Sequence, residues 1–208
     1  CRSSLLLLAL GVLAAAPATA ADPTPGECSG AGGASASRCL YRSMLPSAGL
    51  VAECESDARC RVGYYAGSPT KATWLAPPRG LATLPKPQVI WHSATFAEAR
   101  FDCGRPCSVS YFFEARRHFI SQPRWFVLDV DLRRQLLAAA EERALVVRQI
   151  FSGREVARIE RPWSQAAWLG DVVTTLRFDP DGRLSFTWLR GSERAPVRER
   201  VSIPSIPR

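Results

Sequence analysis

The feature that most constrains the fold is a regular alternation of apolar and polar residues near the end of the chain. Apolar side chains occupy every second position of Leu184–Trp188, and the same holds for Val197–Ile203 except where Glu199 interrupts the apolar row. Successive side chains of a β-strand point to opposite faces, so this pattern predicts strands with one buried and one solvated face. Such strands are typical of antiparallel sheets.

Turn residues separate these alternating segments. Asp179–Gly182 lies between two apolar alternations, and it contains a proline that fixes φ and a glycine that can adopt a positive φ. Ser152–Arg154 and Gly191–Glu193 are glycine-containing turns of the same kind. The C-terminal half is therefore predicted to consist of β-hairpins.

Residues 127–160 and 173–203 share one order of strands and turns, a rhythm that also occurs in propeller blades. The chain is too short for a complete propeller. We therefore expect a mainly β fold of antiparallel sheets, arranged as a sandwich, an open barrel or a partial propeller-like assembly. A small disulfide-stapled N-terminal segment is expected to precede it.

Strands are also predicted at Gln88–Phe96, Val109–Phe113 and Trp125–Leu132. The segment Arg133–Phe151 fits either an amphipathic helix or a hairpin that turns at Glu141–Arg143. Its β-branched residues favour the hairpin.

The N-terminal residues predict export. Residues 1–20 contain a positive charge, a short apolar run and Ala18-Thr19-Ala20, which together are typical of a cleaved secretory signal peptide. We expect a periplasmic or secreted protein without a transmembrane segment in its mature form, because no later apolar run approaches the length of a membrane span.

The rest of the chain divides into three parts by composition. Residues 21–38 are rich in alanine, proline, glycine and serine, which predicts a flexible leader. Residues 39–87 form a cysteine-rich segment, with a short helix expected at Ser47–Arg59, and end in a proline-rich connection. Residues 88–208 form the β-rich domain.

Six cysteines follow the predicted signal peptide, and an even number in an exported chain predicts disulfides. They are Cys28, Cys39, Cys54, Cys60, Cys103 and Cys107. The short spacings favour the pairs Cys103–Cys107 and Cys54–Cys60. We expect no metal site, because paired Cys-x-x-Cys motifs are absent and only two histidines are available. No cofactor-binding motif is present either.

The chain is basic, with a formal net charge of +8 at pH 7. All but two of its 27 basic residues are arginines, a bias that is typical of a GC-rich bacterial genome. The charge therefore does not by itself indicate a nucleic-acid-binding protein. The partners that we expect are an envelope protein or an anionic glycan.

Few residues are candidates for catalysis. Asp129 and Asp131 lie two positions apart, so both carboxylates project from one face of the predicted strand. Together with a histidine such as His92, they could perform acid–base chemistry. The alternative is that they are solvated acids that pair with neighbouring arginines.

The best candidate for binding is a cluster of cations and aromatic rings. Arg116, Arg117 and His118 precede Phe119, and Trp125 follows shortly afterwards. Guanidinium groups beside aromatic rings suit a carboxylate or a phosphate. The alternative is a solvated, arginine-rich loop.

These observations predict an exported bacterial envelope protein with a non-enzymatic binding role, as an inhibitor, an immunity-type factor or an adaptor. Two other functions remain open. One is a small hydrolase that uses Asp129, Asp131 and a histidine, and the other is a structural component of the envelope.

Overall fold

The computed structural model describes residues 26–29, 37–45, 47–104, 106–163 and 168–205. The predicted signal peptide at residues 1–20 lies outside this part of the chain. The described residues form strands and two short 3₁₀ helices, η1 (Pro69–Lys71) and η2 (Leu169–Asp171), and they contain no α-helix. The prediction of a mainly β fold with antiparallel sheets is confirmed.

The strands form four antiparallel sheets, and each sheet is a run of consecutive strands. Sheet A contains β1 (Glu27–Ser29), β2 (Ser37–Arg42), β3 (Ala48–Ser56), β4 (Arg59–Ala66) and β5 (Thr73–Trp74). Sheet B contains β6 (Gln88–Trp91), β7 (Phe96–Gly104), β8 (Cys107–Glu114), β9 (Phe119–Ile120) and β10 (Arg124–Trp125). Sheet C contains β11 (Val127–Asp131), β12 (Leu136–Glu141), β13 (Ala144–Gln149) and β14 (Glu155–Glu160). Sheet D contains β15 (Val173–Phe178), β16 (Arg183–Arg190) and β17 (Ala195–Ser202).

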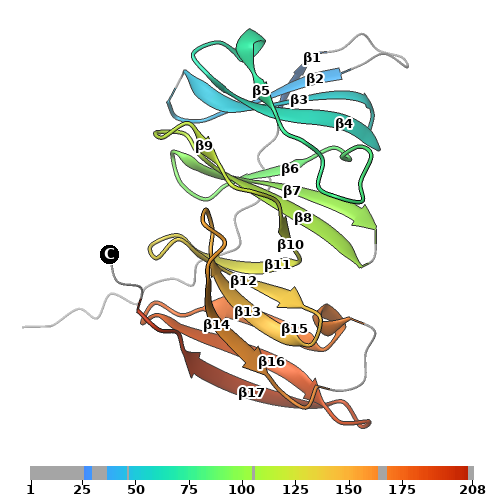
Figure 1. Ribbon diagram of the computed structural model, residues 1–208, viewed down its shortest axis with the longest axis vertical. Coiled ribbons are helices and arrows are strands. Elements are labelled where there is room, and N and C mark those ends of the chain that lie inside the picture. Colours follow the sequence, from blue (N-terminus) through green and yellow to red (C-terminus); the bar gives the residue numbers. More distant parts are fainter. Residues whose placement is uncertain (1–25, 30–36, 46, 105, 164–167, 206–208) are drawn as a thin grey trace, which may run out of the picture.

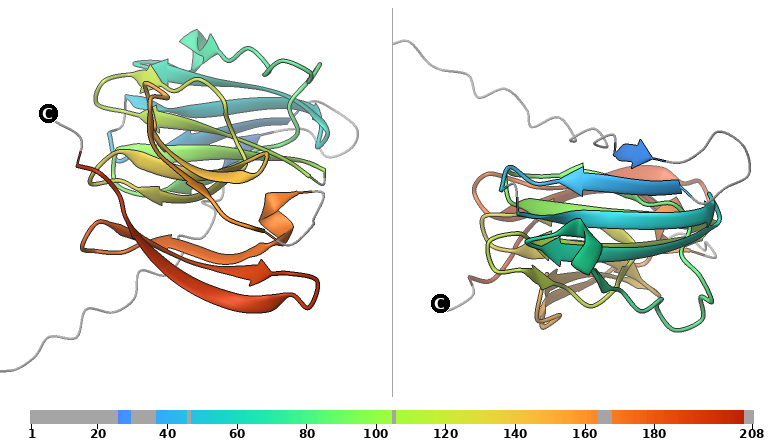
Figure 2. Two further views of the ribbon diagram at one scale, coloured as in Figure 1. Left: turned by 60° about the horizontal axis from the view of Figure 1, so that its bottom comes forward. Right: turned by 90° about the horizontal axis from the view of Figure 1, so that it is seen from above.

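The four sheets stack face to face in chain order along the long axis of the molecule (Figures 1 and 2). One large apolar core lies between sheets A and B, and another lies between sheets C and D. The core between sheets B and C is smaller, and its buried members are Phe96, Phe112, Leu137, Ala139 and Ile150. The fold therefore consists of two β-sandwiches, A–B and C–D, and the apolar core between the two sandwiches is smaller than the core inside each of them.

The prediction of one continuous strand over Trp125–Leu132 is wrong, because this segment is divided between two strands. Its first residue closes sheet B in β10, and β11 then opens sheet C. Between them Phe126 has a φ of 52°, which redirects the chain from one sandwich to the other. A β-bulge between Val127 and Asp129 also shifts the alternation of side chains in β11.

The predicted strand Gln88–Phe96 is also too long, because β6 ends at Trp91 and a loop precedes β7. Strand β7 was not predicted from the sequence. Its apolar row of Ala97, Ala99 and Phe101 faces sheet A, and the charged residues between them had masked the pattern.

The helix expected at Ser47–Arg59 is absent, and β3 occupies this segment. Its apolar residues pack in the core between sheets A and B, so tertiary packing overrides the local helical pattern. Gly49 allows this strand to lie close to its neighbours. A Cβ atom there would meet the carbonyl oxygen of Tyr41 at 2.5 Å.

Several local predictions are confirmed. Arg133–Phe151 contains the hairpin of β12 and β13, in which Glu141 pairs with Ala144. The turns at Ser152–Arg154, Asp179–Gly182 and Gly191–Glu193 also connect antiparallel strands.

The six cysteines form three disulfides, and both predicted pairs are present. The bonds are Cys28–Cys39, Cys54–Cys60 and Cys103–Cys107. The first joins β1 to β2, and β1 lies within residues 21–38, where we expected a flexible leader. Among the described residues, no helix has the length and apolar character needed to cross a bilayer.

Glu199, which interrupts the apolar row of β17, has two partners in the structure. Its carboxylate accepts hydrogen bonds from the Trp188 indole (2.7 Å) and from Nε of Arg161 (2.8 Å). We expect Glu199→Ala to lower the free energy of unfolding by about 1–3 kcal/mol, because the buried indole N–H loses its acceptor. Urea denaturation measures this loss, and Glu199→Gln, which keeps an acceptor, should recover part of it. Equal stability of the alanine variant and the wild type would contradict this assignment.

Candidate functional site

The candidate catalytic residues each have a separate partner. The carboxylate of Asp129 accepts a hydrogen bond from the backbone N–H of Phe178 at 2.6 Å, and burial raises its pKa. Asp131 accepts one from Nε of Arg134, also at 2.6 Å. His92 bonds to Glu98 rather than to either aspartate. These three side chains therefore form no hydrogen-bonded catalytic group.

Glu98 is the centre of a polar network that sequence reasoning missed. Its side chain is 0% exposed, and it lies on the face of sheet B that is turned toward sheet C, because it pairs across the strands with Phe112 of the core between these sheets. Its carboxylate is within hydrogen-bonding distance of His92 Nε2 (3.1 Å), Arg100 Nε (2.9 Å) and Ser110 Oγ (2.6 Å). Burial raises the pKa of Glu98, but these three partners together outweigh burial and lower it to about 2.

The predicted binding cluster is divided between two places. Arg116, Arg117 and His118 form the turn after β8, and Phe119 begins β9. Trp125 and Phe119 both pair with residues of β8. The partner of Trp125 is Val109, and the partner of Phe119 is Glu114, five residues further along the strand. Five residues of strand span roughly 17 Å, so Trp125 belongs to a different surface.

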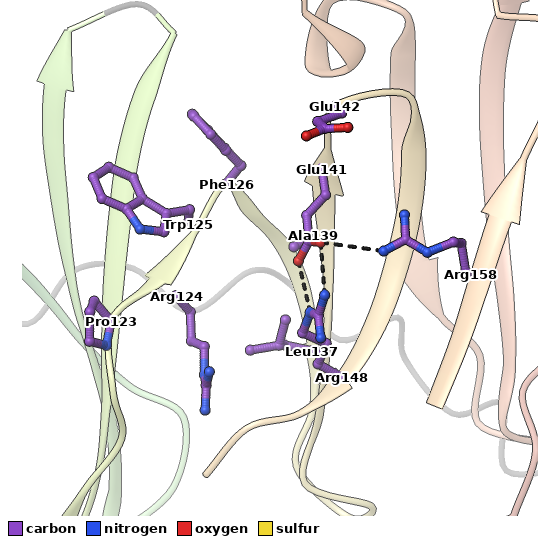
Figure 3. A pocket seen from close by; sticks show the side chains of 10 residues that line it. All are labelled: Pro123, Arg124, Trp125, Phe126, Leu137, Ala139, Glu141, Glu142, Arg148 and Arg158. Atoms are coloured by element: carbon purple, nitrogen blue, oxygen red, sulfur yellow. Dashed lines mark hydrogen bonds and ion pairs between the residues drawn. The ribbon is translucent and has the colours of Figure 1, made fainter. Parts of the chain in front are cut away.

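Trp125 instead lines a cavity at the junction between the two sandwiches, with a volume of about 490 Å³ (Figure 3). We call it the junction cavity. Its residues come from the end of sheet B and from sheet C, and they are Pro123, Arg124, Trp125, Phe126, Leu137, Ala139, Glu141, Glu142, Arg148 and Arg158.

One wall of the junction cavity is aromatic. The rings of Trp125 and Phe126 lie on the same side, with centroids 6.1 Å apart, and both side chains are partly exposed. The change of direction at Phe126 places these consecutive residues in the lining of the cavity. Phe126 also packs against Trp168, at 5.6 Å between centroids.

The opposite wall is charged (Figure 3). Both nitrogens Nε and Nη2 of Arg148 donate to the carboxylate of Glu141 at 2.8 Å, and Arg158 approaches the same carboxylate at 3.8 Å. The hydrogen bond from Arg148 lowers the pKa of Glu141. Glu142 occupies the turn of the β12–β13 hairpin with a φ of 47°.

Arg124, which lines the cavity, joins the two sandwiches by hydrogen bonds. Its Nε and Nη2 donate to the carbonyl oxygens of Ile150 (2.9 Å) and Phe151 (3.0 Å) in sheet C's β13–β14 turn. Burial, and then repulsion from Arg148, lower the pKa of Arg124. The guanidinium packs over Gly153, where a Cβ atom would meet Nη1 at 2.6 Å.

This arrangement can hold a flat ligand more readily than it can perform acid catalysis. A catalytic carboxylic acid needs a raised pKa, whereas the pKa of Glu141 is lowered by Arg148. Charged side chains inside apolar strands, such as Arg148 and Glu98, were a signal that sequence reasoning did not use. Both lie at the junction between the sandwiches, where a polar group can find partners.

Within the described ranges, no group of three or more potential ligand side chains is placed to hold a metal ion. Comparisons with models of protein families, with curated proteins and with solved structures found no match for this chain.

Proposed function

We propose that this chain is an exported, non-enzymatic binding module of the bacterial envelope that holds a segment of an acidic glycan in the junction cavity. The observation that carries this proposal is the pairing of an aromatic wall, Trp125 and Phe126, with a wall of carboxylate and guanidinium groups. Export is supported by the sequence of residues 1–20 and by the three disulfides.

A sugar ring fits these two walls because it has an apolar face and an edge of hydroxyl groups. The apolar face can stack on an aromatic ring, as other amphipathic ligands do. The hydroxyl groups can donate to Glu142 and accept from Arg158. Arg148 and Arg158 already pair with carboxylates, because Glu155 lies 3.1 Å from Arg148 and 3.0 Å from Arg158. A carboxylate on the sugar can bind these guanidinium groups by taking the place of Glu155.

Binding of a uronic-acid oligosaccharide is expected to depend on Trp125. We expect Trp125→Ala to weaken the binding of oligogalacturonate by about 1–3 kcal/mol, or about 5- to 150-fold in Kd, because the ligand loses its stacking surface. Isothermal titration calorimetry at low salt measures this difference.

Trp74→Ala is the matched control, because Trp74 is also partly buried but lies in β5 of sheet A, with Arg61 over its ring at 4.2 Å. It should leave the affinity unchanged. A fully methyl-esterified oligogalacturonate should bind more weakly than the acid, since it lacks the charge. Equal losses in the two tryptophan variants, or no binding of the acidic oligosaccharide, would contradict the proposal.

A further inference from the structure

Two large apolar side chains are exposed among the described residues, and both lie at the same end of the first sandwich. Met44 is 80% exposed in the loop between β2 and β3, and Phe119 is 50% exposed at the start of β9. Figure 1 shows the β2–β3 loop, the β8–β9 turn and the β6–β7 loop on one side of the stack of sheets. Exposed apolar side chains that gather at one place mark an interaction surface.

Backbone hydrogen bonds hold these loops beside one another. The N–H of Met44 donates to Ala94 O (3.1 Å), which joins the β2–β3 loop to the β6–β7 loop. The N–H of Ala115 donates to Thr95 O (2.7 Å), which joins the β6–β7 loop to the turn after β8. The ring of Phe119 packs against the ring of Phe151, with 5.3 Å between their centroids.

Two arginines lie in the turn that precedes Phe119. Arg116 and Arg117 are exposed in the turn between β8 and β9, and in the described part of the chain neither guanidinium forms an ion pair. The nearby acid, Glu114, accepts the backbone N–H of Arg116 at 3.2 Å. We call Met44, Arg116, Arg117 and Phe119 the basic-apolar edge.

We propose that the basic-apolar edge docks onto the surface of an anionic lipid bilayer. Its two arginines complement the negative charge of lipid headgroups, and Met44 and Phe119 can enter the boundary between headgroups and acyl chains. Reversible attachment of this kind needs both an apolar and an electrostatic contribution, and the edge supplies both. A soluble polyanion would use the arginines but would leave the apolar side chains in water. This surface is separate from the junction cavity.

Vesicle co-sedimentation of the exported protein tests the proposal. Wild-type protein should bind vesicles made of equal parts phosphatidylcholine and phosphatidylglycerol, and it should bind pure phosphatidylcholine vesicles far more weakly. Arg116→Ala/Arg117→Ala should weaken binding to the anionic vesicles by about 25-fold, because each arginine near such a surface contributes about fivefold. Met44→Ser/Phe119→Ser should weaken binding to both kinds of vesicle by at least about tenfold.

Arg79→Ala/Arg190→Ala is the matched control, since it removes two exposed arginines outside the basic-apolar edge. It should bind anionic vesicles as the wild type does, and thermal unfolding should show that all three double variants remain folded. Equal losses in the two arginine variants would overturn the proposal, as would full binding by the Met44/Phe119 variant. Complete displacement by inorganic phosphate or polyglutamate would also overturn it and indicate a site for soluble anions or acidic proteins.

Discussion

Replacing Glu98 with alanine is expected to lower the free energy of unfolding by about 3–5 kcal/mol. The carboxylate is fully buried, and it is the shared acceptor for His92, Arg100 and Ser110. Removing it would leave these donors without a partner at the junction between the sandwiches. Urea denaturation near neutral pH measures the change, and a loss of less than about 1 kcal/mol would show that solvent or other groups satisfy the three donors.

The same carboxylate predicts a dependence of stability on pH. Its pKa falls from 4.5 to about 2 in the folded protein, so its stabilising effect is present above pH 4.5 and is lost as the pH falls toward 2. The loss over this interval should be about 3 kcal/mol. Glu98→Gln cannot titrate, so the difference in unfolding free energy between wild type and this variant should shrink over the same interval. A constant difference would contradict the assignment.

Replacing Phe112 with alanine is also expected to cost about 3–5 kcal/mol of unfolding free energy. Phe112 is 0% exposed, and it lies on the face of sheet B that is covered by sheet C rather than on the face that packs against sheet A. Its ring packs near Phe96, with centroids 5.9 Å apart. The substitution would leave a cavity in the small core at the junction.

Denaturation of Phe112→Ala therefore tests whether the two sandwiches are stacked. Phe119→Ala is the control, because the side chain of Phe119 is half exposed and its loss should cost less than about 1 kcal/mol. Similar losses in the two variants would mean that sheet C does not cover Phe112.

The hairpins of the C-terminal half were predictable because local chemistry determines them. The alternation in β16 and the turn at Asp179–Gly182 indicate the same register, which holds from Phe178 paired with Leu184 to Thr175 paired with Thr187 and shifts only at a bulge between Val173 and Thr175. The disulfides Cys54–Cys60 and Cys103–Cys107 close short loops, so their spacing was sufficient to predict them.

The stacking of the sheets could not be predicted in the same way. Sheet B is covered on both faces, so β7 and β8 do not show a simple alternation of buried and solvated residues. In β7 the charged row includes Glu98, which is buried because partners from other parts of sheet B surround it. The change of sheet at Phe126 depends on one residue with a positive φ, for which the local sequence carries no signal.

The junction cavity was not predicted from the sequence. Trp125 was among the expected binding residues, but its neighbours in the sequence analysis, Arg116–Phe119, lie on another surface. The charged wall comes from Glu141, Arg148 and Arg158, which three different strands bring together. Sequence spacing alone cannot show that these strands face Trp125, since that depends on how the second sandwich packs on the first.

The most direct test of the central claim, that the junction cavity is the ligand site, is a two-dimensional NMR titration of the ¹⁵N-labelled protein with oligogalacturonate. The indole N–H of Trp125 and the backbone amides of Phe126, Glu141 and Glu142 should shift in a saturable manner. The indole signals of Trp74 and Trp188, which lie in sheets A and D, should stay in place. Saturable shifts confined to sheet A or sheet D, with the Trp125 indole unchanged, would contradict the assignment of the cavity.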